Sequence, residues 1–364
     1  MMGIYLDGMF YGCSGVGRVF ENLMETFAAR PDLGEIHTMV PEAQKDRFLE
    51  RFQTPSIKPQ FVGYGPMSAG DLFRKSVALC SLKGAVRLFF FPGHNVPIYV
   101  PGNYVMVLHD LTVLSERFAL PAYQKAGFRR LLARAVQKAQ DVVAVSATTR
   151  RDLIREFNVP AENVRVIYSW VREEFFLPPP EEDPYVAGEY ILYLGLRIAH
   201  KNVDGVLQAF AILAEWFPEL KLVVAGPRYS TPDMVDQWMK DPRVKGRIVE
   251  IPKVTDEGIR NLFAGAKAFV FPSFAEGFGL PPLEAMAAGV PVVCSDIAVF
   301  REVYGVAVRY VDPENPASIA KGVKDVLTNP VLAQTLREKG RDRAAMYRRN
   351  EATGKYLDLV EANI

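Results

Sequence analysis

The sequence has few of the residues that cross-link small domains or hold structural metal ions. It contains three cysteines, Cys13, Cys80 and Cys294, and four histidines in 364 residues. The cysteines lack the close spacing of a zinc site, and neither His37 nor His200 has metal-ligand spacing with the other histidines. We therefore expect no disulfide framework and no structural zinc site, and a reducing compartment fits this composition.

Charge of one sign and long apolar runs are also lacking. Lysine and arginine number 43 against 42 acidic residues, so the formal net charge of +1 gives no bulk field that attracts nucleic acid. No apolar run approaches the ~20 residues of a membrane-spanning helix. The first residues lack the basic start and apolar centre of a signal peptide. Together with 49% hydrophobic and 23% charged residues, these features lead us to expect a globular, cytoplasmic protein.

Strand-like and helix-like segments alternate along the whole chain. Residues 125–139 show the clearest helical periodicity, with apolar side chains at i, i+3, i+4 and i+7 spacing. Such alternation is typical of parallel sheets with helices on both faces. The expected strands are residues 3–6, 86–91, 104–108, 141–145 and 164–168 in the first half, and 190–194, 220–225, 247–251, 266–271 and 290–294 in the second.

A proline-rich and acidic stretch at residues 177–184 separates the two halves. At ~150 residues per domain the length also predicts two domains. We place the first domain at residues 1–177 and the second at 178–364. The final helix, at about residues 346–364, could pack back on the first domain.

The most informative segment is residues 271–291, where Glu276 and Glu284 stand eight positions apart. A buried strand leads into it, Gly277 and Gly279 allow a tight turn, and Pro281 suits the first turn of a helix. This order places Glu276 after the carboxyl end of a strand and Glu284 in the first helical turn. In open α/β sheets the crevice at that edge binds ligands.

A glycine-rich loop follows the first strand. Gly12, Gly15 and Gly17 precede a helix expected at residues 19–28, which suits a phosphate or a sugar hydroxyl. A plain strand-to-helix turn is an equal alternative. The segment is not a Walker motif, since no Gly-Lys-Ser/Thr follows.

Further polar residues follow other expected strands. His109 ends the strand at residues 104–108 and could bind a substrate or act as acid or base, unless Asp110 or the backbone satisfies it. His94 is a weaker candidate. Arg197 and Lys201 could neutralise a diphosphate, or could be solvated loop residues.

Gly226 marks another turn after a strand of the second half. The chain contains no Asp-x-Asp, which removes the usual carboxylate pair for a metal on a nucleotide diphosphate. Positive side chains and helix N-termini would have to carry that charge instead.

Residues 271–291 resemble the Glu-x7-Glu segment of the retaining glycosyltransferases of family 4, which have the GT-B fold. The resemblance covers nearly the whole chain, with motifs in the family's order. It implies two Rossmann-like domains of doubly wound parallel sheet, facing each other across a cleft. The other matching segments are residues 12–18, 109–112, 143–146, 151–153, 164–167, 195–202, 225–227 and 311–313.

The resemblance also implies roles for single residues in the donor site. Glu276 would contact the hydroxyls of the donor sugar, and Glu284 would hold the ribose. Backbone amides around Phe278, Gly279 and Leu280 would face the phosphates.

Further positions match in other segments, and one departs from the family's pattern. Lys201 matches the lysine that neutralises the leaving diphosphate, and His109 matches a cleft histidine near the donor sugar. Gly15 and Gly17 match the loop near acceptor and diphosphate. Arg197 departs from the usual place of the arginine partner.

The function implied is retaining transfer of a hexose, of mannose or glucose type, from a UDP- or GDP-sugar to an acceptor hydroxyl. No metal or other cofactor is expected, and Glu276 as base or nucleophile ranks below its sugar-holding role. The acceptor would be a saccharide or a lipid-linked saccharide, in polysaccharide, lipopolysaccharide or glycolipid assembly. The alternatives are a GT-B epimerase or phosphorylase and a non-catalytic sugar-nucleotide-binding protein.

Membrane contact is a separate expectation. Arg130, Arg134 and Lys138 form a basic stripe opposite the apolar face of their helix, which suits peripheral docking on the inner face of a membrane. A solvated helix face is the ordinary alternative. The sequence leaves the oligomeric state, the sugar and the base of the donor open.

Overall fold

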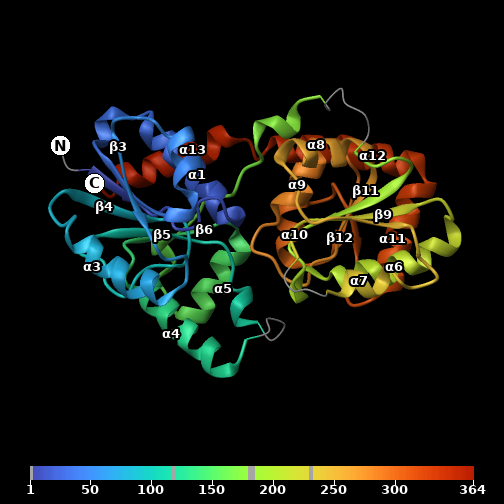
Figure 1. The fold of residues 1–364 in the computed structure, drawn as a ribbon, viewed down its shortest axis with the longest axis horizontal. Helices are drawn as coiled ribbons and strands as arrows, with labels where there is room; N and C mark the ends of the chain where they lie inside the picture. Colours follow the sequence, from blue (N-terminus) through green and yellow to red (C-terminus); the bar gives the residue numbers. More distant parts are fainter. Residues whose placement is uncertain (1–2, 116–119, 179–184, 229–232) are drawn as a thin grey trace. The chain divides into compact units, whose positions relative to one another are not determined.

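The computed structural model describes residues 3–115, 120–178, 185–228 and 233–364, and it divides into two compact units (Figure 1). Within the described residues, the first unit comprises the chain up to Leu114, Leu120–Ser169 and Asn350–Ile364, and the second comprises Ser115 and Trp170–Arg349. The main change of unit, between Ser169 and Trp170, comes before the boundary that we placed at 177/178. The segment after Ser169 joins the second unit because Phe175 is buried and packs on Phe263, with ring centroids 5.8 Å apart.

The first unit is built on a seven-stranded parallel sheet in the order β3-β2-β1-β4-β5-β6-β7. Its inner strands are mostly apolar and buried, as expected of a parallel sheet covered on both faces, whereas the edge strands β3 and β7 expose Lys58, Gln60 and Arg165. The strands are β1 (Gly3–Leu6), β2 (Ile36–Pro41), β3 (Ile57–Val62), β4 (Val86–Phe91), β5 (Tyr104–Leu108), β6 (Asp141–Ala144) and β7 (Val164–Val166).

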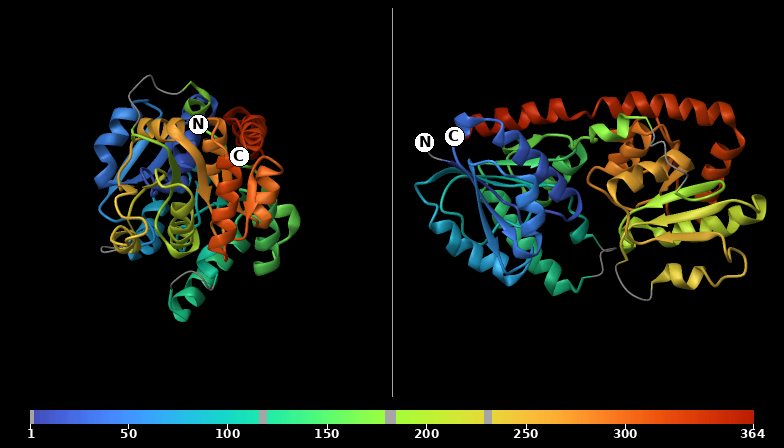
Figure 2. Two further views of the ribbon diagram at one scale, coloured as in Figure 1. Left: turned by 90° about the vertical axis from the view of Figure 1, so that its right-hand side faces the viewer. Right: turned by 45° about the horizontal axis from the view of Figure 1, so that its top comes forward.

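Helices cover both faces of this sheet (Figure 2). One core joins the sheet to α3, α4 and α5, through residues such as Leu79, Leu132 and Leu153. On the other face, Phe90 of β4 packs against α1 and against the last helix. The helices of the unit are α1 (Ser14–Ala28), α2 (Lys45–Arg51), α3 (Lys75–Cys80), α4 (Ala122–Lys138), α5 (Ala147–Phe157) and α13 (Arg349–Glu361).

The last helix, α13, packs on the first unit although it follows the second in sequence. Its Tyr356 is buried and lies 6.0 Å from the ring of Phe90. The chain end is also fixed there, since the side-chain amide of Asn363 donates a 2.9 Å hydrogen bond to Asp141. The chain thus closes the first unit only after the second is complete.

The second unit has a six-stranded parallel sheet in the order β10-β9-β8-β11-β12-β13. This is the Rossmann order, in which the direction of winding reverses between the first and fourth strands, here β8 and β11. The strands are β8 (Tyr190–Leu194), β9 (Lys221–Ala225), β10 (Ile248–Ile251), β11 (Ala266–Phe271), β12 (Val292–Ser295) and β13 (Arg309–Val311).

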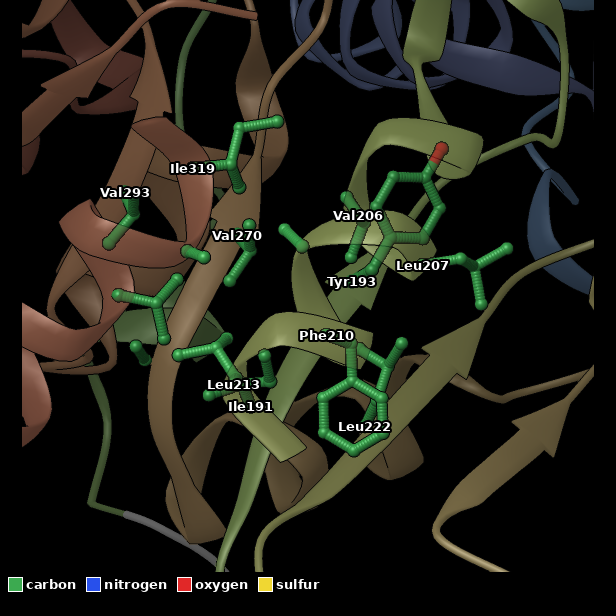
Figure 3. Packing of buried hydrophobic residues seen from close by; sticks show 14 of the residues in the cluster. Ile191, Tyr193, Val206, Leu207, Phe210, Leu213, Leu222, Val270, Val293 and Ile319 are labelled. Atoms are coloured by element: carbon green, nitrogen blue, oxygen red, sulfur yellow. The ribbon is translucent and has the colours of Figure 1, made fainter. Parts of the chain in front are cut away.

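The core of the second unit lies between its sheet and α6 (Figure 3). Val206, Phe210 and Leu213 of α6 pack on Ile191 and Leu222 of the sheet. Also in this unit are α7 (Met234–Trp238), α8 (Asp256–Gly265), α9 (Leu280–Ala287), α10 (Ala298–Tyr304), α11 (Pro316–Thr328) and α12 (Pro330–Ala345), with α6 spanning Val203–Trp216.

Candidate functional site

The candidate site lies at the carboxyl edge of the second sheet, beside β8 and β11. The loop after β8 carries Lys201, and the loop after β11 carries Glu276. These strands are neighbours at the point where the winding reverses, which is where open α/β sheets bind their ligands. The topology thus brings together two segments that are about seventy-five residues apart in sequence.

Lys201 and Glu276 form an ion pair across this edge. The Lys201 Nζ donates to Glu276 Oε1 at 2.5 Å, and the two side chains are 21% and 9% exposed. The ammonium also lies 5.6 Å from the centre of the Phe271 ring. The cation predicted for the diphosphate and the carboxylate predicted for the sugar are therefore each other's partners in this structure.

Asn202 fixes the loop that presents Lys201. It adopts a left-handed conformation with φ of 55°, which asparagine tolerates better than most residues. Its side-chain oxygen caps α6 by accepting from the amide of Gly205, and its amide donates to the carbonyls of Pro272 and Pro313. One side chain thus ties the β8 loop to the segment that follows β11.

Arg197 is held by two carboxylates. Its Nη1 lies 2.7 Å from Asp233 and 2.5 Å from Glu250, and its side chain is 1% exposed. Arg228 adds a second cation to Glu250. These partners could not be predicted from the sequence. They neutralise the charge of Arg197 from within the protein.

Gly226 lies at the same edge, after β9. Its φ of 115° suits glycine, and a Cβ there would stand 2.5 Å from the carbonyl oxygen of Gly195. The absence of a side chain therefore allows the loops after β8 and β9 to pack closely. The close packing of these loops therefore explains why residue 226 is glycine, without reference to a ligand.

Gly279 begins α9 in a left-handed conformation with φ of 86°. A Cβ there would meet the Tyr304 hydroxyl at 2.1 Å, and that hydroxyl donates a 2.6 Å hydrogen bond to the Gly279 carbonyl. Phe278 before it is buried and packs on Tyr347, with ring centroids 5.5 Å apart. Leu280 is the first helical residue, so the positions expected to face phosphates do form a helix start.

Glu284 lies in the second turn of α9, because the helix begins at Leu280. The predicted position in the first turn was wrong, because the helix starts one residue before the proline pair. The Glu284 side chain is 2% exposed, and its Oε1 lies 4.0 Å from the Nε of Arg172. A carboxylate this deeply buried requires polar neighbours.

Several buried polar atoms at this edge have no hydrogen-bond partner among the described residues. They include the Tyr193 hydroxyl, the Ser273 hydroxyl and the Nε of Arg197. Figure 3 shows the Tyr193 oxygen at one end of the apolar core, away from Ile191 and Leu213. Because unsatisfied buried groups are uncommon in folded proteins, their gathering beside the Lys201 and Glu276 loops is a signal of a ligand or water site.

Two of the three glycines predicted for the loop of the first unit lie in a helix, whereas Gly12 lies in the loop before it with φ of 75°. Helix α1 begins at Ser14, so Gly15 and Gly17 occupy its first turn, whereas we expected the helix to start at residue 19. A Cβ on Gly17 would stand 2.3 Å from the Phe10 carbonyl oxygen, so this glycine is required by packing. A Cβ on Gly15 would meet nothing within 4 Å, so packing does not explain Gly15.

His109 follows β5 and bonds to backbone. Its Nε2 lies 2.8 Å from the Pro92 carbonyl oxygen, and because a carbonyl only accepts, Nε2 carries the proton. Burial lowers the pKa of His109, so the ring is neutral near pH 7. Its Nδ1 has no hydrogen-bond partner in the described part of the chain and can accept one from a ligand hydroxyl. His94, the weaker candidate, lies against Phe128, and burial lowers its pKa as well.

The structure also contains a buried charge cluster that the sequence analysis missed. The Nζ of Lys75 lies 3.2 Å from Asp7 and 2.6 Å from Asp71, and it donates to the Asn95 carbonyl at 2.9 Å. The Asn95 amide bridges both carboxylates, and Tyr5 donates to Asp7. Burial raises the pKa of Asp7, against the effect of Lys75. Asp71 and Lys75 stand at i,i+4 spacing, which suits an ion pair on a helix, but no spacing rule connects them with Asp7 or Asn95.

Two structural features are absent from the described residues. No group of three or more His, Cys, Asp or Glu side chains among them is arranged to hold a metal ion. None of their helices combines the length and the hydropathy that a bilayer crossing requires.

Comparison with protein families gives two matches that cover adjoining parts of the chain. The family described as Glycosyl transferases group 1 matches residues 179–343, and Glycosyltransferase Family 4 matches residues 92–175. An O-antigen chain mannosyltransferase of Salmonella typhimurium is 30% identical over 67% of this chain and 65% of its own length. An Escherichia coli protein named O-antigen chain mannosyltransferase B is 30% identical over 74% of this chain and 73% of its own.

Solved structures with the same fold cover the whole chain. Sucrose-phosphate synthase from Thermosynechococcus elongatus superposes with a TM-score of 0.80 at 17% identity, covering 100% of this chain and 99% of that one. The Anabaena protein HepE in complex with UDP-glucose gives a TM-score of 0.80 at 15% identity, with full coverage of both chains. At such identities the likeness shows the fold alone. It confirms the predicted GT-B fold of two Rossmann-like parallel-sheet domains.

Proposed function

Because this chain belongs to glycosyltransferase family 4, we propose that it transfers a hexose from a nucleoside diphosphate sugar to an acceptor hydroxyl with retention of anomeric configuration. Membership of the family confirms the predicted resemblance and the assignment to the glycosyltransferases. The names of the relatives favour mannose as the sugar, and they favour a saccharide acceptor in lipopolysaccharide assembly. The Anabaena complex supports a nucleotide sugar as donor.

One observation carries the proposal: Lys201 and Glu276 meet where the second sheet reverses its winding. During transfer the bond from the sugar C1 to the diphosphate breaks, and a bond to the acceptor oxygen forms on the same face. The acceptor proton passes to the departing diphosphate. Lys201 stabilises the negative charge that builds up on this leaving group, and Glu276 orients the sugar through its hydroxyls.

A transfer assay with GDP-mannose and UDP-glucose tests this proposal. Donors that bind should first raise the midpoint of thermal unfolding, since ligand binding stabilises the folded state by mass action. Transfer should then release the nucleoside diphosphate, and NMR of the product should show the anomeric configuration of the donor. Binding without turnover on any saccharide acceptor would favour the alternative of a non-catalytic sugar-nucleotide-binding protein, and an inverted product would overturn the retaining mechanism.

We further propose that transfer proceeds without a metal ion. Lys201 and the amino end of α9 supply positive potential at the site, and the sequence has no Asp-x-Asp. Activity in EDTA equal to that in Mg²⁺ or Mn²⁺ is the expected outcome. Loss of activity on chelation, with recovery on adding the metal, would contradict this part of the proposal.

Docking on anionic membranes is proposed for α4. This helix carries five basic residues and no acidic one. Arg130, Arg134 and Lys138 make no ion pair with any described residue, while Tyr123 at its start is 73% exposed. Flotation with vesicles containing anionic lipid at low salt should carry the protein upward, and replacing the three basic residues by glutamine should abolish this. Equal flotation of both proteins would exclude α4 as the docking surface.

A further inference from the structure

Arg172 lies next to Glu284, the carboxylate that we expect to hold the ribose. It belongs to the second unit, between Val171, whose amide bonds to the Tyr347 carbonyl, and a short 3-10 turn at Glu173–Phe176. Its Nε lies 4.0 Å from Oε1 of Glu284. The Arg172 and Glu284 side chains are 18% and 2% exposed, so water screens this contact little.

The guanidinium of Arg172 is held rigidly by other partners. Both of its Nη atoms reach Asp256, at 2.6 and 3.0 Å, and Nη1 also lies 2.9 Å from Glu174. Its carbon lies 4.8 Å from the centre of the Phe175 ring. The two contacts with Asp256 and the stacking on Phe175 fix the plane of the guanidinium, so its Nε–H has a single orientation.

That remaining group, the Nε–H of Arg172, is buried and has no hydrogen-bond acceptor among the described residues. Glu284 is the carboxylate beside it, too far for a direct hydrogen bond but close enough for strong attraction in a buried setting. The arrangement leaves an unpaired donor 4.0 Å from a carboxylate oxygen. The charge of Arg172 attracts the carboxylate and thereby orients it.

We propose that Arg172 is the positioning residue of Glu284, and that it tunes recognition of the ribose hydroxyls of the donor. This inference rests on the proposed function, in which Glu284 accepts hydrogen bonds from the ribose. Arg172 acts through Glu284 and does not contact the nucleotide. Replacing Arg172 should therefore weaken the binding of nucleotides that have ribose hydroxyls and leave the binding of nucleotides without them unchanged.

The test compares UDP and GDP with their 2′,3′-dideoxy forms by calorimetry, using whichever base binds. Arg172→Gln should weaken binding of the ribonucleotide about tenfold, the equivalent of one charge-assisted hydrogen bond. Binding of the dideoxy form should change less than twofold. Arg172→Lys keeps the positive charge but loses the two-pronged contact with Asp256. Its affinity for the ribonucleotide should lie between that of Arg172→Gln and that of the unchanged protein.

Arg348→Gln is the matched control. Arg348 pairs with Glu173 of the same turn and lies 4.0 Å from the Phe176 ring centre, but it is 48% exposed and makes no contact with Glu284. This variant removes one positive charge from the same region and should leave both affinities unchanged. Equal weakening of both nucleotide forms in Arg172→Gln would overturn the proposal, because it would reveal a general effect on folding or charge.

Glu284→Gln separates this inference from the proposed function. If Glu284→Gln weakens only the ribonucleotide and Arg172→Gln weakens neither form, Arg172 has no positioning role but the ribose assignment stands. If Glu284→Gln has no ribose-dependent effect, the ribose assignment itself fails. Ribose-dependent weakening in both variants supports both statements.

Discussion

The ion pair between Lys201 and Glu276 leads to an unusual prediction: removing a site carboxylate should strengthen nucleotide binding. With Nζ and Oε1 at 2.5 Å and an effective dielectric constant near 20, the Coulomb attraction is roughly 7 kcal/mol before desolvation is subtracted. The net worth of a hydrogen bond to a charged group is only about 1.5–3 kcal/mol. A diphosphate must compete with Glu276 for the same ammonium.

Glu276→Gln keeps the shape of the side chain and removes its charge. Lys201 is then free to meet the diphosphate, and one negative charge that repels the ligand is gone. Taking the lower end of the range, about 1.5 kcal/mol, the Kd of UDP or GDP should fall about tenfold. The gain should shrink at high ionic strength, because salt screens partly exposed charges.

Calorimetry with the nucleoside diphosphate and with the complete nucleotide sugar measures this effect. The gain should be smaller for the nucleotide sugar, since the introduced amide cannot replace all the hydrogen bonds of a carboxylate to sugar hydroxyls. The transfer rate should fall, because orientation of the sugar is lost. Glu219→Gln, an exposed change on the same unit, is the control for overall charge.

The reasoning is refuted if Glu276→Gln binds the diphosphate as weakly as the unchanged protein or more weakly. Such a result would mean that Lys201 does not exchange partners when the nucleotide binds. A Lys201→Met variant distinguishes the remaining explanations. It should weaken diphosphate binding, and combining it with Glu276→Gln should remove the gain.

Three other predictions concern stability and are read from urea titrations. Lys75→Met leaves two buried carboxylates without their cation and should cost about 3–5 kcal/mol, whereas the exposed control Lys83→Met should change little. The free energy of unfolding should fall as pH drops below 6.5, because burial holds the pKa of His109 below that value and the unfolded chain binds a proton that the folded chain does not; His109→Gln should flatten this slope. Gly279→Ala should cost about 2–3 kcal/mol through its left-handed backbone and the Tyr304 hydroxyl, whereas Gly354→Ala, within α13 and in open space, should stabilise by about 0.5–1 kcal/mol.

Elements whose apolar pattern is strong were predictable from the sequence. The strand at Ala266–Phe271 and the helix at Val203–Trp216 have the expected bounds, because burial on one or both faces leaves a periodic signal. The start of α1 was not predictable. Glycine usually signals a loop, but Gly17 lies in a helix. This position needs glycine because the Phe10 carbonyl approaches it too closely for any side chain.

The partners of charged residues were beyond the sequence for a different reason. Asp7 meets the i,i+4 pair of Asp71 and Lys75 only because the fold brings the end of β1 beside the start of α3. Likewise, Arg172 follows the first unit in sequence, while its partner Asp256 begins α8. Such pairs join residues at large and irregular separations, so they leave no periodicity. Residue types at strand ends indicated where the site would lie, but not which charges would already be paired.

That pairing separates the roles of the two predicted cations. Arg197 is 1% exposed and has two carboxylates, Asp233 and Glu250, so moving it to a ligand would leave two buried charges unsatisfied. Lys201 is 21% exposed and has one carboxylate partner, Glu276. When the donor binds, the sugar hydroxyls can replace Lys201 as the partner of Glu276. The cost of exchanging partners is therefore far smaller for Lys201. On this ground we expect Lys201 to be the cation that pairs with the diphosphate, and we expect Arg197, which holds the surrounding loops, to influence binding only through their position.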